Sequence, residues 1–209
     1  MVSTLSDYRE LVVAQFHDSI ETPPRFFQDN ADLIARCSFE MARRFQRGGR
    51  LLVFGSGAST TDAQHVAVEF VHPVIVGKRA LPAIALTNDI GSVLGLMQSA
   101  GADEIFARQL QLLGTRDDIA MGLTTNGGDE KVLRALDIAR EMEMLTIGMC
   151  GDASDNSRHA RSMFEASLDF CFRVPSNNPY VIQEVQETTY HILWETVHVF
   201  FEQQVSNGG

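Results

Sequence analysis

One histidine and one glutamate four positions apart could bind a metal ion or exchange a proton with a substrate. These are His65 and Glu69, and a helix through this segment would present both side chains on the same face. Imidazole and carboxylate groups at this spacing can share one ion, or act as acid and base on one substrate. An ordinary surface ion pair has the same spacing, and that interpretation is the more typical one for the pair taken alone.

A second polar stripe lies near the end of the chain, where Gln183, Glu187 and His191 follow one another at steps of four. Gln183 and His191 would be about 12 Å apart along a regular helix. They could share one ion only if the helix were distorted or if another subunit supplied ligands. His191 is equally consistent with a core histidine beside Trp194.

Two loops rich in glycine and small polar residues could hold an anion. Each follows an apolar run and precedes a helical pattern, so backbone N–H groups at the helix start could face a ligand. The candidate binding residues are Ser56, Gly57, Ala58 and Ser59 in the first loop, and Thr124, Thr125, Asn126 and Asp129 in the second. Asp129 would place a carboxylate where a phosphate belongs, and it is equally consistent with a simple helix cap.

Alternating strand and helix patterns after residue 50 predict where these groups would lie. Five short apolar runs read as strands at 51–54, 83–86, 119–123, 145–149 and 170–174. Helical patterns fill 61–71, 104–113, 130–142 and about 180–204. The pattern predicts a doubly wound α/β domain with a parallel sheet, whose ligands bind at the carboxyl ends of the strands.

The segment before the sheet carries two helical patterns. The first ends before Pro23 and Pro24, and the second can be capped by Asp29 or Asn30 and stopped by Gly48 and Gly49. We therefore expect an N-terminal helical hairpin over residues 1–49, followed by an α/β core over residues 50–209 with a long C-terminal helix.

Composition excludes several classes of protein. The chain has 209 residues, with 17 basic against 27 acidic side chains and a net charge of −10, which disfavours nucleic acid and anionic lipid as partners. Its longest charge-free run, 13 residues between Asp89 and Asp103, is too short to span a membrane. Three cysteines without metal-type spacing favour a reducing cytoplasm.

Several motifs, in order along nearly the whole chain, resemble the sugar isomerase (SIS) domain family and in particular the phosphoheptose isomerases. The motifs are Gly55-x-Gly57-x-Ser59, Asp62-Ala63-Gln64-His65-x-x-x-Glu69, Leu81-Pro82-Ala83-Ile84-Ala85-Leu86, Asp103-Glu104-Ile105-Phe106-x-Arg108-Gln109, Ile182-Gln183-Glu184 and Tyr190-His191-Ile192-Leu193. The resemblance implies one SIS domain over residues 1–209, a three-layer α/β/α fold with a five-stranded parallel sheet.

The same resemblance implies a reaction and a metal site. It makes His65, Glu69, Gln183 and His191 ligands of one Zn²⁺ per subunit, with Glu69 and His191 as the catalytic acid and base. It implies a homotetramer whose sites lie at subunit interfaces. The implied reaction interconverts sedoheptulose 7-phosphate and a heptose 7-phosphate through an enediolate, which a metal ion would stabilise as a Lewis acid.

Gln183 also belongs to the residues predicted to bind the substrate. At several other of these positions the chain departs from the family. Asn126 and Asp129 replace loop serines, and Gln98 and Ser99 stand where an Asn-Asp pair is usual. A family arginine falls at Pro73. Two alternatives therefore remain open: a non-catalytic SIS protein, either a phosphosugar sensor or an adaptor of a replication initiator, and an isomerase for a ligand with less negative charge near Asp129.

Overall fold

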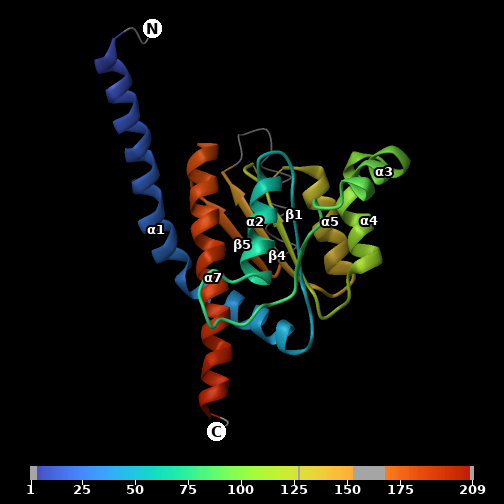
Figure 1. Cartoon of the computed structure of the whole chain (residues 1–209). Coiled ribbons are helices and arrows are strands. Elements are labelled where there is room, and N and C mark those ends of the chain that lie inside the picture. The colour runs from blue at the N-terminus through green and yellow to red at the C-terminus, as the bar shows by residue number, and fades with distance from the viewer. Residues whose placement is uncertain (1–3, 127, 153–167, 208–209) are drawn as a thin grey trace.

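A five-stranded parallel sheet forms the centre of the protein, in a computed structural model that describes residues 4–126, 128–152 and 168–207 (Figure 1). The strand order is β2-β1-β3-β4-β5. The strands are β1 (Leu51–Gly55), β2 (Ala83–Ala85), β3 (Ile119–Leu123), β4 (Leu145–Gly151) and β5 (Phe170–Val174). The predicted parallel sheet is confirmed, and each predicted strand lies within two residues of the observed one.

Helices cover both faces of the sheet, which gives the predicted three layers. Side chains of a strand alternate between the faces, so Leu51 and Val53 enter one buried cluster while Leu52 and Phe54 enter the other. The first cluster lies beneath α1 (Leu5–Gln46), α2 (Ser59–Val71) and α7 (Pro179–Asn207). The second lies beneath α4 (Ile105–Leu113) and α5 (Glu130–Glu141), with partial cover from α3 (Ile90–Ala100).

The predicted N-terminal hairpin is wrong, because one helix of 42 residues, α1, runs from Leu5 to Gln46. Pro23 and Pro24 lie inside it. A proline removes a backbone donor and bends a helix without necessarily ending it, and Figure 1 shows α1 changing direction along its length. Gly48, with φ of 90°, follows the helix as predicted for its stop.

Helix α3 was not predicted from the sequence. None of its residues is buried, and it carries two glycines, so it lacks the amphipathic pattern that marks a packed helix. Its start is nevertheless well defined, since Asp89 accepts hydrogen bonds from the backbone N–H and the hydroxyl of Ser92 at 3.2 and 2.6 Å. A 3₁₀ turn at Ala102–Glu104 joins α3 to α4. No helix in the described part of the chain has the length and apolarity to cross a membrane.

The strand order places the loop after β1 beside the loop after β3. Strand β1 lies between β2 and β3. The chain therefore adds β2 on one side of β1 and then adds β3, β4 and β5 in turn on its other side. In open α/β sheets such a reversal is where ligands bind, which here corresponds to the carboxyl ends of β1 and β3.

Candidate metal and active site

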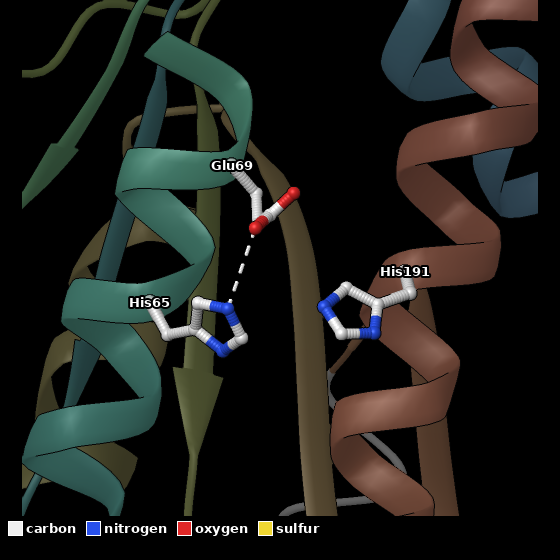
Figure 2. Close-up of side chains that lie close together, drawn as sticks. All are labelled: His65, Glu69 and His191. Atoms are coloured by element: carbon white, nitrogen blue, oxygen red, sulfur yellow. Dashed lines mark ion pairs between the residues drawn. The ribbon is translucent and has the colours of Figure 1, made fainter. Parts of the chain in front are cut away.

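His65, Glu69 and His191 converge between α2 and α7, as Figure 2 shows. His65 and Glu69 extend from one face of α2, with 3.4 Å between Nε2 and Oε1. His191 extends from α7 toward them, and the two imidazole rings lie 5.3 Å apart, nearly perpendicular. The parallel packing of α2 and α7 thus brings the pair His65 and Glu69 next to His191, residues whose proximity the sequence did not show.

The three side chains fit a transition-metal ion. One donor atom from each lies within 4.8 Å of the other two. Ligands of a tetrahedral zinc ion lie about 3.4 Å apart, given metal–nitrogen bonds of about 2.0–2.1 Å, so small rotations of the side chains suffice. Two imidazoles and a carboxylate also form the donor set of catalytic zinc sites, which keep a further position for water or substrate.

The imidazole of His65 is fixed from its other side. Its Nδ1 lies 2.8 Å from the hydroxyl of Tyr190 and 3.5 Å from Oε1 of Glu187. Such an outer contact fixes the ring orientation of a metal-binding histidine. Burial, followed by the negative charge of Glu187, raises the pKa of the Tyr190 hydroxyl, so this group stays protonated. Its oxygen can accept the Nδ1–H of His65 while Nε2 faces the metal-binding cluster.

Gln183 contacts Asp62, a residue to which the sequence analysis gave no role at the site. Its side-chain Nε2 donates to both carboxylate oxygens of Asp62, at 2.8 and 2.9 Å. Burial raises the pKa of Asp62, and the hydrogen bond from Gln183 partly opposes this rise. Because its nitrogen is held in this way, Gln183 keeps its amide oxygen available as a ligand, and its place in the metal site stays a prediction.

The first glycine-rich loop packs closely against the start of α2. A side chain at Gly55 would meet the backbone of Ser59 at 2.6 Å, and Gly57 has a φ of 60°, so both positions require glycine. Ala58 stands at the N-cap without a side-chain cap, and Ser59 is buried at the first helical position. Ser56 donates a hydrogen bond to Asp129 of the second loop.

The second loop is built around its own side chains. Asp129 caps α5 by accepting from the N–H groups of Lys131 and Val132, at 3.1 and 3.4 Å, which confirms the cap interpretation. Asn126 Oδ1 accepts from the Thr124 hydroxyl at 3.0 Å. Thr125 lies partly buried in the same loop.

Gln98 and Ser99 lie away from this cluster within one chain. Both are exposed on α3, which packs with α4 in the layer opposite α2 and α7 (Figure 1). Ser99 donates to the carbonyl of Gly95 in its own helix, at 2.8 Å. Their role in substrate binding stays a prediction.

The chain belongs to the SIS domain family, whose model matches residues 15–151. Its relatives include the phosphoheptose isomerase of Solidesulfovibrio magneticus, 34% identical over 193 residues, which cover 92% of this chain and 91% of the relative. The phosphoheptose isomerase of Synechocystis is 38% identical over 157 residues, covering 75% and 77%.

Solved structures give the same assignment. The phosphoheptose isomerase GmhA of Neisseria gonorrhoeae superposes with a TM-score of 0.81 at 26% identity, covering 91% of this chain and 98% of that one. The enzyme of Francisella tularensis gives 0.79 at 30% identity, covering 93% and 98%. The protein is therefore an enzyme of the phosphoheptose isomerase type, an aldose–ketose isomerase.

Proposed function

We propose that the protein interconverts sedoheptulose 7-phosphate and a heptose 7-phosphate. The observation that carries this proposal is the convergence of His65, Glu69 and His191 between α2 and α7. The three side chains together offer metal-binding atoms, and two of them, Glu69 and His191, can also move protons. Aldose–ketose isomerisation requires both proton transfer and stabilisation of a developing oxyanion. A non-catalytic sensor or adaptor would need neither.

Glu69 and His191 would divide the proton transfers between them. The Glu69 side chain is largely buried, with 12% of its surface exposed, so its carboxylate can take a proton from a substrate carbon away from bulk water. His191, facing it from α7, would serve the neighbouring oxygen or carbon of the enediolate. The two residues come from different helices, so they can flank the reacting carbons.

We further propose that His65, Glu69, Gln183 and His191 hold one Zn²⁺ per subunit, with Gln183 supplied across a subunit interface because it lies about 12 Å from His191 along α7 of its own chain. When bound, the ion would supply Lewis-acid stabilisation of negative charge on the substrate oxygen. Tyr190 and Asp62 would orient two of the ligands, His65 and Gln183, through the contacts described above.

A homotetramer with sites at subunit interfaces is proposed as the working assembly. Leu5, Val12, Phe16 and Ile20 share one face of the N-terminal half of α1, and all are exposed, Phe16 by 66%. Figure 1 shows this half extending beyond the rest of the molecule. A contiguous exposed apolar stripe is typical of an interface. Three cysteines without metal-type spacing fit a reducing compartment, and the cytoplasm is proposed on that ground.

The first experiment is turnover of sedoheptulose 7-phosphate by zinc-loaded protein, followed by NMR. We expect an aldoheptose phosphate to form, and Glu69→Gln to lower kcat by about 100-fold or more because it removes the base. Glu184→Gln makes the same change at an exposed position of α7 and serves as the control. Unchanged turnover in Glu69→Gln would refute the assigned chemistry.

The assembly has its own test. Phe16→Glu places a charge within the apolar stripe of α1 and is expected to lower the molar mass measured by light scattering. Ala14→Glu, on the opposite side of the same helix, is expected to leave it unchanged. A molar mass of one chain for the unmodified protein would exclude the tetramer.

A further inference from the structure

The loops that follow β1 and β3 meet through one hydrogen bond, from the Ser56 hydroxyl to the Asp129 carboxylate. These strands are neighbours in the sheet, with β2 and β4 on their outer sides, so the contact lies where the strand order reverses. His65 is six residues beyond Ser59, or about 9 Å further along α2. An extended sugar with its reacting carbons at the histidine cluster would therefore reach this contact with its distal end.

The Asp129 carboxylate engages the hydrogen-bond donors at the start of α5. It accepts from the backbone N–H groups of Lys131 and Val132, at 3.1 and 3.4 Å, and from the Ser56 hydroxyl. Amides at a helix start and a hydroxyl are the donors that bind phosphate. The Lys131 ammonium lies 3.5 Å from the same carboxylate, so the charges of these two residues balance and the pair itself offers no positive excess to a dianion.

The neighbouring side chains also present acceptors. Asn126 Oδ1 accepts from the Thr124 hydroxyl at 3.0 Å and from the N–H of Gly128 at 3.1 Å, which engages two further donors of the loop. Gln186 donates its Nε2 to the Thr124 carbonyl at 2.8 Å, and its buried Oε1 has no hydrogen-bond partner among the residues that the structure describes. Gln186 is itself buried, so its Oε1 adds an acceptor, not a donor, to the surroundings of the loop.

Resting on the proposed isomerase function, we propose that Asp129 is a specificity-determining residue. It replaces the substrate phosphate at the start of α5, so the enzyme binds sugars whose distal end is an uncharged hydroxyl group at least as well as it binds their phosphates. The reacting end of the sugar stays at the histidine cluster, and the isomerisation itself is unchanged.

The test compares sedoheptulose with sedoheptulose 7-phosphate on the zinc-loaded protein, with dissociation constants from calorimetry and kcat/KM from NMR. Asp129→Ser removes the charge and keeps a good helix cap, so the fold is expected to persist. We expect this change to strengthen binding of the sugar phosphate by about tenfold or more, because a like charge is removed, and to leave the free sugar unaffected. Glu130→Gln, an equal charge change at the next, exposed position, is expected to change neither constant.

Two results would overturn the inference. One is that the unmodified protein binds the phosphate more than about tenfold tighter than the free sugar, a difference of about 1.4 kcal/mol. The other is that Asp129→Ser leaves phosphate binding unchanged. Binding and turnover separate this inference from the proposed reaction: a gain in phosphate affinity without isomerisation of either sugar would refute the reaction and uphold the role of Asp129.

Discussion

Trp194 donates its indole N–H to the backbone carbonyl of Glu69, 2.8 Å away, and so connects α7 directly to the end of α2. Within a regular helix this carbonyl would accept from the residue four positions later. That residue is Pro73, which has no N–H. Trp194 therefore provides the donor that the chain itself lacks, at the residue proposed as the catalytic base.

Removing this donor should disturb both stability and catalysis. Trp194→Phe leaves a carbonyl of the last helical turn without its partner, and we expect a loss of about 1–3 kcal/mol in the free energy of unfolding, measured in urea. A lower kcat with little change in KM should accompany it, because Glu69 is no longer held in place. Phe200→Leu, on the same helix, is the comparison; an equal drop in kcat there would assign the effect to general loosening of α7.

The contact between Asp62 and Gln183 predicts a change in metal affinity. Asp62→Asn weakens the double acceptor that holds the Gln183 amide, and loss of such an outer contact typically lowers metal affinity by about 10- to 100-fold. Competition with a zinc-binding dye would measure this change. Asp103→Asn, at an exposed position, provides the control. Equal affinities of the two variants would remove Asp62 from the metal site.

The strands and the core were predictable because their physical cause is local. Strands that are buried on both faces have nearly continuous apolar sequences, and each of the five was predicted to within two residues. The contact between Asp62 and Gln183 joins residues 121 positions apart, and only the packing of α2 on α7 reveals it. Helix α3 buries no side chain and so leaves no periodic signal in the sequence.

The N-terminal helix shows a different limit of sequence reasoning. Two consecutive prolines are a strong signal for a helix end, and here α1 continues through Pro23 and Pro24. The second half of α1 packs beside α7 and buries Phe26, Ile34 and Met41. Tertiary packing of that face provides the stability that the lost backbone hydrogen bonds do not.

The cysteines should differ in their reactivity toward iodoacetamide. Burial, followed by the negative charge of Asp169, raises the pKa of the Cys37 thiol, so it stays in the unreactive thiol form. We expect Cys171, which is partly exposed, to be labelled first, and Cys37 to react at least about 100-fold more slowly until the protein unfolds. Mass spectrometry of peptides would show the order, and early labelling of Cys37 would contradict it.

The raised pKa of Cys37 also predicts how the free energy of unfolding changes with pH. Because the folded pKa of Cys37 exceeds the unfolded one, its contribution to stability is complete below the unfolded pKa. That contribution is lost as the pH rises toward the folded pKa, since only the unfolded chain ionises readily. Unfolding in urea at increasing alkaline pH should show the loss in the unmodified protein and a smaller loss in Cys37→Ala.

Metal binding should stabilise the fold by joining α2 to α7. An ion that binds the folded state alone adds about 2.7 kcal/mol at a free concentration of 100 times its Kd, so Tm should rise on addition of zinc and fall back with a chelator. His191→Ala removes the one ligand among the three clustered residues that α7 contributes, and we expect it to abolish most of the rise. His72→Ala, an exposed histidine just beyond α2, should keep it. An equal rise in Tm for both variants would mean that zinc binds elsewhere, because the cluster in Figure 2 cannot join the two helices without His191.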